Sequence, residues 1–209
     1  MLRAMSEGDF FQPEAKKKTA QAIKSIESKT SVEVVVALRH RVAEYRATDM
    51  LFGFACACSA LAALWFSPST YAVEHMPFEM LGAFVVGAAL SSFVRPLRRV
   101  LTPKAAVQRQ LDTAARAAFY DLGISKTHRR TGLLVYTSLY ENAVVLVPDA
   151  AVDRKALIEL GSAKSAIESA LAARDFDAFL KALEQITPPL EKAMPRKAGD
   201  ENELPDEPV

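Results

Sequence analysis

The stretch that decides the fold is MLFGFACACSALAALWFSPSTYAV, residues 50–73, which contains no charged side chain. A second apolar run, MLGAFVVGAALSSFV at residues 80–94, follows after a short link. A helix needs roughly 17 to 25 mainly apolar residues to cross the hydrocarbon of a bilayer. The first run reaches this length between residues 50 and 67. The second reaches it if the helix begins at residue 76, which places Glu79 at the level of the lipid headgroups. The sequence predicts a transmembrane hairpin with spans at about 50–67 and 76–94.

Flanking charge favours membrane spans over the alternative reading of two buried helices in a soluble core. The link between the runs carries Glu74, His75 and Glu79 but no Lys or Arg. Basic residues flank the hairpin on both sides: Arg39, Arg41, Arg46, Arg95, Arg98, Arg99 and Lys104. By the positive-inside rule, both termini and everything outside the hairpin are expected on the cytoplasmic side of an inner or plasma membrane.

Composition limits what the rest of the chain can be. The chain has 209 residues, half of them hydrophobic, and a formal charge of +1, which leaves room for one domain of about 150 residues beside the hairpin. This charge gives no reason to expect a nucleic-acid partner. Cys56 and Cys58 both lie in the first apolar run, where helical geometry points them to nearly opposite faces. Their spacing indicates neither a redox pair nor a zinc site.

The segments around the hairpin predict a small α/β domain. Residues 31–38 (SVEVVVAL) are typical of a strand buried on both faces, and we expect this strand to be central. Two more strands are predicted at 132–138 and 143–147, joined by a short turn. Helices are predicted at 14–28, at 104–122 before Gly123, from Asp149 or Asp153 to about 173, and from Asp175 or Asp177 to about 194.

Connection lengths predict how the strands pair. The long connection between the first two strands favours a parallel pair, and the short turn makes the third strand antiparallel to the second. The predicted fold class is therefore α/β, with a small mixed sheet between helices (α/β/α) and the transmembrane hairpin inserted in the first crossover. The expected boundaries are 14–49 and 95–195 for the two parts of the domain, 50–94 for the hairpin, and 196–209 for a disordered acidic tail.

The parts of the chain outside the hairpin, from about residue 16 to 196, resemble the TPM domain family. The resemblance rests on several short sequence patterns that occur in the same order. They are IESKTSVEVVVAL, then AARAAFYDLGISKTHRRTGLLVYTSLYENAVVLVPD, then LEKAMPR and NELPDEP. The chain is most similar to the bacterial membrane-anchored branch of that family. The resemblance implies an α/β/α sandwich; some members are described as acid phosphatases, some bind calcium, and many have no assigned activity.

A binding site is predicted at one end of the sheet, where the first two strands begin and the third ends. The candidate residues there are Thr30, Glu33, Arg130, Thr131 and Asp149. Thr30 and Glu33 match the family's Thr-x-x-Glu at the start of the first strand. The family usually has an acidic residue or Asn immediately before the glycine that opens its second strand, whereas this chain has Arg130 and Thr131.

That replacement weakens the case for a metal, because calcium prefers several anionic oxygen ligands and only Glu33 and Asp149 remain. No cofactor is expected, with calcium as the possibility that the resemblance raises. Each residue also has a structural reading: Glu33 as a partner of a backbone amide or of Arg130, Asp149 as a helix cap, and Arg130 as a solvated or lipid-facing loop residue.

The sequence predicts a non-enzymatic module, anchored in the lipid bilayer, that interacts with or maintains a membrane protein complex. The alternative is a membrane-tethered hydrolase of the phosphatase type that uses the polar cluster at the sheet end. No familiar nucleophile or nucleotide-binding motif occurs, which lowers the expectation of an enzyme. A channel or transporter subunit is less favoured, because Glu79 at the edge is the one charge within the two spans.

Overall fold

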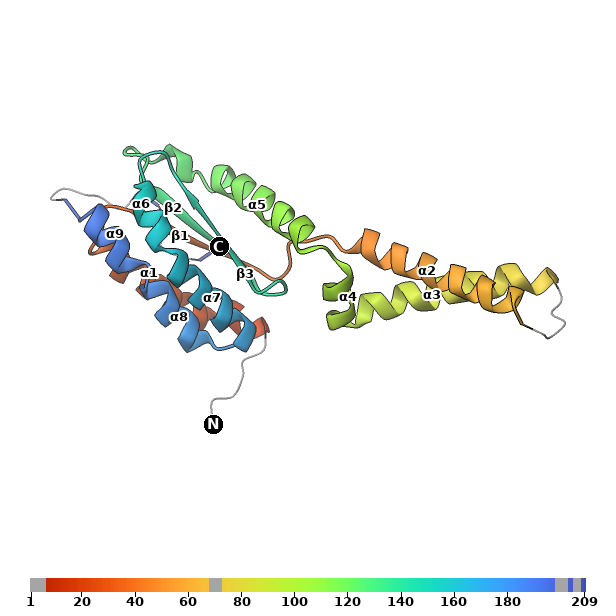
Figure 1. Cartoon of the computed structure of the whole chain (residues 1–209). Coiled ribbons are helices and arrows are strands. Elements are labelled where there is room, and N and C mark those ends of the chain that lie inside the picture. The colour runs from red at the N-terminus through yellow and green to blue at the C-terminus, as the bar shows by residue number, and fades with distance from the viewer. Residues whose placement is uncertain (1–6, 68–72, 198–202, 205–207) are drawn as a thin grey trace. The chain divides into compact units, whose positions relative to one another are not determined.

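The computed structural model describes residues 7–67, 73–197, 203–204 and 208–209. The chain forms two compact units, one made of Met1–Val42 and Leu111–Val209 and the other of Ala43–Gln110. The first unit contains a three-stranded mixed sheet with helices, and the second is helical (Figure 1). The predicted fold class, a mixed α/β fold with two long apolar helices inserted in the first crossover, is confirmed.

The sheet consists of β1 (Glu33–Arg39), β2 (Gly132–Ser138) and β3 (Ala143–Pro148), in that spatial order. β1 and β2 are parallel, with Glu33 beside Gly132. β2 and β3 are antiparallel, with Leu133 beside Pro148. Both strand directions agree with the prediction from the lengths of the connections.

The prediction that the first strand is central is wrong, because β2 lies between β1 and β3. β1 nevertheless has the sequence of a buried strand, since other segments cover its outer edge. The Val34 amide donates to the Glu27 carboxylate at 2.8 Å. The Val209 amide donates to the Val36 carbonyl at 3.1 Å, and the Leu38 amide donates to the Val209 carbonyl at 2.9 Å. An edge strand covered in this way is as apolar as a central one.

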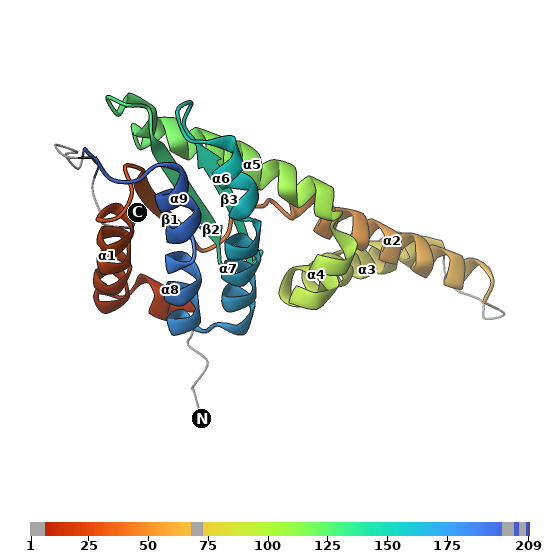
Figure 2. The same ribbon diagram turned by 60° about the vertical axis from the view of Figure 1, so that its left-hand side comes forward.

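Helices cover both faces of the sheet (Figures 1 and 2). On one face lie α1 (Pro13–Glu27), α7 (Gly161–Ala173) and α8 (Phe176–Glu184), and on the other lies α5 (Lys104–Asp121), whose residues from Leu111 onward belong to this unit. The shorter helical segments of the unit are η1 (Glu7–Phe11), η3 (Ile124–Lys126), α6 (Arg154–Glu159) and α9 (Thr187–Ala193).

Strand alternation divides the core between the two faces. Val34 and Val36 of β1 join a continuous buried cluster that includes Phe10, Ile23 and Phe179. The intervening strand residues face α5, which buries its own side chains on that side, among them Leu111, Ala115 and Phe119. β2, with helices on both of its faces, is buried along its whole length.

The helix ends follow the capping residues in the sequence. Gly123, with a φ of 70°, follows α5 in the left-handed conformation that favours glycine. Asp153, rather than Asp149, caps α6 by accepting from the Lys155 amide, and Asp175 caps α8 in the same way. The single helix predicted to reach residue 173 is instead two helices, α6 and α7, which meet at Leu160.

The second unit is dominated by α2 (Arg46–Trp65) and α3 (Met76–Phe93), which lie side by side (Figures 1 and 2). The short segments η2 (Val73–His75) and α4 (Arg95–Leu101) flank α3. By length and composition, α2 and α3 are suited to cross a bilayer. Large apolar side chains on the two helices are exposed: Met50, Leu51, Phe54, Leu61, Trp65, Phe78, Leu81, Val85, Val86, Leu90 and Phe93.

Small residues line the contact between α2 and α3. The buried residues are Gly53 and Ala57 on α2, and Gly87 and Ser91 on α3. A Cβ atom added at Gly87 would lie 2.8 Å from the Cys56 Cβ. These glycines therefore let the two backbones approach closely, as small residues do where helices pack in membranes.

A polar cluster lies where α4 meets the start of α2 and the end of α3. The Arg98 guanidinium forms a salt bridge with the Asp49 carboxylate, and the side chains are only 9% and 14% exposed. The Ser91 hydroxyl donates to Asp49 Oδ1 at 2.8 Å. The Arg98 guanidinium also lies over the Tyr45 ring, 5.2 Å from its centroid. This cluster joins α2, α3 and α4 within the second unit.

Two predicted segments fall partly outside the described residues: the link between the apolar runs, at 68–72, and the acidic tail, at 198–202 and 205–207. In the described part of the tail, Arg196 Nη1 donates to the Glu27 carbonyl at 2.6 Å. The Leu204 amide donates to the Glu33 carboxylate at 3.3 Å, and Glu203 accepts from the His128 amide at 2.8 Å. Disorder of the remaining tail stays a prediction.

Candidate functional site

The sheet topology brings the predicted site residues to one end of the sheet. The register places Glu33, at the start of β1, beside the start of β2, which directly follows Arg130 and Thr131. The antiparallel β3 ends at the same place, immediately before Asp149. Thr30 lies three residues before β1. The side chains of these residues, however, do not form one cluster.

Arg130 and Asp149 form a close ion pair. Arg130 Nε lies 2.9 Å from both carboxylate oxygens, and Nη2 lies 2.9 Å from Oδ1. The Ala150 amide donates to the same carboxylate at 2.7 Å. The Asp149 side chain is 2% exposed, whereas that of Arg130 is 53% exposed. Hydrogen bonding to Asp149, followed by its negative charge, raises the pKa of Arg130, so this side chain remains a cation.

Backbone geometry helps to place the Arg130 side chain. Arg130 has a φ of 55°, a left-handed conformation that is uncommon for a residue other than glycine. Its carbonyl accepts from the Ala151 amide at 3.0 Å, while the Asp149 amide donates to the Gly132 carbonyl at 2.8 Å. These two backbone bonds hold the loop before β2 against the segment after β3.

The other predicted site residues have separate partners. The Thr30 hydroxyl donates to the Met194 carbonyl at 2.7 Å, and the Glu33 carboxylate accepts from the Leu204 amide. Thr131 is buried. Of the structural readings, the backbone-amide partner of Glu33 is present, whereas Asp153 rather than Asp149 is the helix cap.

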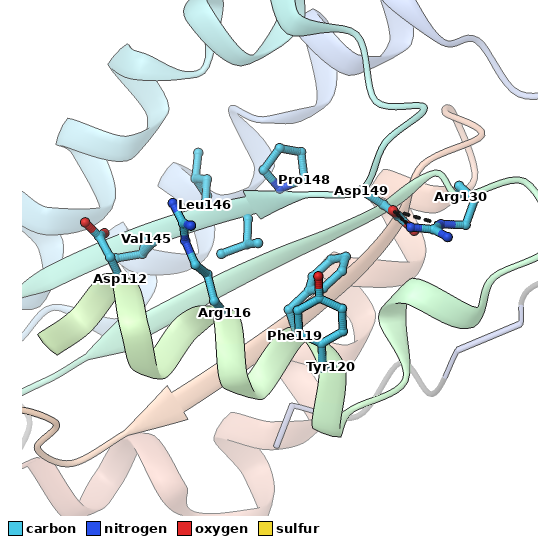
Figure 3. Close-up of a pocket in the computed structure, with 10 residues that line it drawn as sticks. Asp112, Arg116, Phe119, Tyr120, Arg130, Val145, Leu146, Pro148 and Asp149 are labelled. Atoms are coloured by element: carbon cyan, nitrogen blue, oxygen red, sulfur yellow. Dashed lines mark hydrogen bonds and ion pairs between the residues drawn. The ribbon is translucent and has the colours of Figure 1, made fainter. Parts of the chain in front are cut away.

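A groove of about 540 Å³ adjoins the Arg130–Asp149 pair (Figure 3). It lies between α5 and β3, and within the size range of small-molecule and peptide sites. Its lining combines charged, aromatic and aliphatic residues: Asp112, Arg116, Phe119, Tyr120, Arg130, Val145, Leu146, Val147, Pro148 and Asp149. The groove, rather than the sheet end alone, is therefore the open surface at this site.

The sequence analysis missed the contribution of α5 to this groove. Asp112, Arg116 and Tyr120 are spaced four residues apart, so they lie on one face of the helix. This spacing is visible in the sequence, but only the folded chain shows that this face borders β3. Tyr120 is 68% exposed, and its ring lies edge-on to that of Phe119 with the centroids 5.7 Å apart.

The groove is suited to binding an anion next to an apolar group. Arg116 is exposed, and the structure gives it no ion pair with the residues that it describes. The Arg130 side chain is 53% exposed, although its guanidinium is paired with Asp149. Phe119 and Val145 supply a buried apolar floor between them. Among the described residues, no group of three or more His, Cys, Asp or Glu side chains is placed to hold a metal ion.

Comparison with known proteins extends the description of the fold. No family model matches the chain, and no curated protein matches it. The chain is similar to a solved structure, the NMR structure of the BA42 protein from the psychrophilic bacterium Bizionia argentinensis. The two are 16% identical, the match covers 94% of this chain and 92% of that one, and the TM-score is 0.54. At this identity the likeness concerns the fold alone.

Proposed function

We propose that this chain is a membrane-anchored, TPM-like binding module that interacts with a membrane protein. In this proposal α2 and α3 span an inner or plasma membrane, and both termini and the α/β unit lie on the cytoplasmic side. The exposed apolar side chains of the two helices support the anchor, because lipid is the solvent that such a surface prefers. The basic residues that flank the hairpin support the orientation.

The observation that supports a binding function is that the carboxylates at the sheet end already have protein partners. Asp149 is held by a guanidinium and a backbone amide, and Glu33 accepts from the Leu204 amide. In a calcium site these oxygens would face a cation, and Arg130 already supplies the positive charge beside Asp149. The donor set does not fit a calcium ion, and we derive no hydrolytic step from it. Because the groove is open and the Asp149 carboxylate beside it is already paired, the site favours binding of a partner over hydrolysis.

A hydrolase assay tests this proposal against the phosphatase alternative. The full chain in detergent micelles would be incubated with p-nitrophenyl phosphate, with and without calcium or magnesium. We expect no turnover above the rate in buffer and no heat of calcium binding at millimolar ion. Enzyme-like turnover that Glu33→Ala or Asp149→Asn abolishes would reject the binding module in favour of the hydrolase.

Cysteine accessibility tests the anchor and its orientation. Cys56 and Cys58 would first be replaced by Ala, after which a single Cys would be introduced at Thr70 or at Lys197. A membrane-impermeant maleimide should label Thr70→Cys in intact cells, and should label Lys197→Cys only after the membrane is opened. The reverse pattern would place the α/β unit on the opposite side, and labelling of both would reject the two-span topology.

Photo-crosslinking tests the partner. A photoreactive amino acid at Tyr120, in the groove, should form a specific adduct with a membrane protein in native membranes. The same amino acid at Ile158, which is 81% exposed on α6 and does not line the groove, serves as the control. Equal adducts at the two positions, or none at Tyr120, would contradict the proposal.

A further inference from the structure

The outer edge of β3 has unused backbone hydrogen-bonding groups. The Asp149 amide donates to the Gly132 carbonyl. The backbone amides and carbonyls of the odd-numbered residues of β3 therefore point toward β2, and those of the even-numbered residues point toward the outer edge of the sheet. The outward Val144 amide donates to Glu168 Oε1 at 3.4 Å, a long bond. For the outward Leu146 amide, the structure shows no hydrogen-bond partner among the residues that it describes.

This edge borders the groove. Leu146 and Pro148 line it together with Val145 and Val147, so the groove reaches from the α5 face of the sheet to the free edge of β3 (Figure 3). An extended chain placed there could bond to the Leu146 amide and carbonyl while its side chains contact Phe119 on α5. Addition of a strand to a free edge beside a helix is a common mode of peptide recognition.

The lining of the groove contains two carboxylates, Asp112 and Asp149, and two guanidinium groups, Arg116 and Arg130, and we expect Arg116 to select among extended chains. Arg116 projects from α5 toward β3 and has no ion pair with the described residues (Figure 3). Arg130 lies at the far end of the groove, but its guanidinium is already paired with the Asp149 carboxylate. A guanidinium such as that of Arg116, beside an apolar and partly water-excluded floor, favours a carboxylate, which it can bind through two hydrogen bonds.

We propose that the groove between α5 and β3 binds an extended peptide segment that adds as a short fourth strand at Leu146 and places an acidic side chain against Arg116. The inference rests on the proposed binding function and specifies its partner as an acidic, strand-forming segment. Pro148 has no amide hydrogen, and Val144 already uses its own, so the pairing is limited to the one residue between them. A limited edge of this kind favours a short recognition segment over open-ended sheet growth.

The test uses purified full-length chain in phosphatidylcholine nanodiscs and a panel of synthetic peptides. Each peptide is a blocked hexamer of Val and Thr with a neutral fluorophore, and a single Glu occupies a different inner position in each. A matched panel carries Lys in place of Glu. We expect at least one Glu peptide to bind with a dissociation constant below about 1 mM, and its Lys counterpart to bind at least about tenfold more weakly.

Two substitutions locate the peptide. Arg116→Glu should weaken the best Glu peptide at least about tenfold, whereas Arg154→Glu, an exposed arginine outside the groove, should leave its affinity within about twofold. Leu146→Pro removes the outward amide without breaking the ladder to β2, and should weaken binding about fivefold. Hydrogen exchange of the β3 segment in the unsubstituted chain should slow on addition of peptide, which checks the edge without any substitution.

Several outcomes would overturn the proposal. These are equal affinity for Glu and Lys peptides, unchanged affinity in Arg116→Glu, unchanged exchange of β3, or failure of every peptide to bind below about 1 mM. Competition by phosphatidylglycerol nanodiscs that Arg116→Glu abolishes would assign Arg116 to lipid headgroups instead. If crosslinking from Tyr120 to a membrane protein persists while peptides fail, the binding module stands and the strand-addition mode is rejected.

Discussion

Replacement of Arg98 by Met tests whether the polar cluster at the base of the hairpin holds the second unit together. The carboxylate of Asp49 accepts from Arg98 Nε at 3.1 Å and from the Ser91 hydroxyl at 2.8 Å, besides its salt bridge to Nη2. Both side chains are less than 15% exposed, so water screens the pair little. The substitution keeps the apolar stem but removes the guanidinium from Asp49, while the Ser91 hydroxyl still donates to the carboxylate.

The magnitude follows from that loss. Removing one partner of a buried ion pair costs about 3 to 5 kcal/mol, since the remaining charge stays buried without compensation. Loss of the guanidinium from the face of the Tyr45 ring adds about 0.5 to 1 kcal/mol. We therefore expect Arg98→Met to lower the free energy of unfolding by about 3.5 to 6 kcal/mol.

The assay is a titration of the chain from dodecyl maltoside into sodium dodecyl sulfate, followed by far-ultraviolet circular dichroism. Asp49→Asn combined with Arg98→Met removes both charges and keeps an acceptor for Ser91, so the double variant should recover about 2 kcal/mol or more relative to the sum of the single changes. Arg99→Met, at an exposed neighbour on α4, is the control and should cost less than about 1 kcal/mol. A cost below about 1 kcal/mol for Arg98→Met would refute the view that the pair is buried and unscreened.

Three further tests, each with a matched pair of substitutions, concern other parts of the structure. Gly87→Val should lower the unfolding free energy in the same titration by about 1 to 3 kcal/mol, because its Cβ would lie 2.8 Å from a side-chain carbon of the facing helix. Gly82→Val, with nothing within 4 Å of the added Cβ, is the matched control, and equal effects would contradict the close contact. Asn142 has a φ of 50°, so Asn142→Gly should leave the stability measured by thermal unfolding unchanged, whereas Asn142→Ala should lower it by about 1 kcal/mol. Equal stabilities of the two variants would argue against the left-handed turn. Glu27→Ala should lower the free energy of unfolding by about 1 to 3 kcal/mol, because it leaves the Val34 amide without its acceptor. Glu27→Gln keeps an acceptor and should cost less. The opposite ranking would show that the charge matters more than the hydrogen bond.

The strands and their directions could be predicted because their causes are local. Val-rich runs identify β1 and β3, and the lengths of the connections decide whether neighbours are parallel or antiparallel. The order of the strands could not be predicted, because an apolar run records burial and not position. The edge of β1 is covered by Glu27 and Val209, which are respectively just before the strand and far after it in the sequence.

The candidate site was predictable in part for the same reason. Arg130 and Asp149 flank strand ends, so the topology alone brings them to one place, and they form an ion pair there. Arg116 and Tyr120 lie in the middle of a helix, where spacing reveals a shared face but not the element that the face meets. The groove depends on how α5 packs over β3, which is a tertiary property.

Because of the long crossover, β1 is synthesised well before its neighbour β2. The Thr137 hydroxyl donates to the Ala37 carbonyl, 100 residues earlier, and at about 5 to 20 residues per second a ribosome needs about 5 to 20 seconds to make that interval. During this delay β1 has left the ribosome without its neighbour, while the two apolar helices are still emerging. In that interval the valines of β1 lack the strand that later covers them, and an exposed apolar strand is an aggregation hazard until β2 has been made.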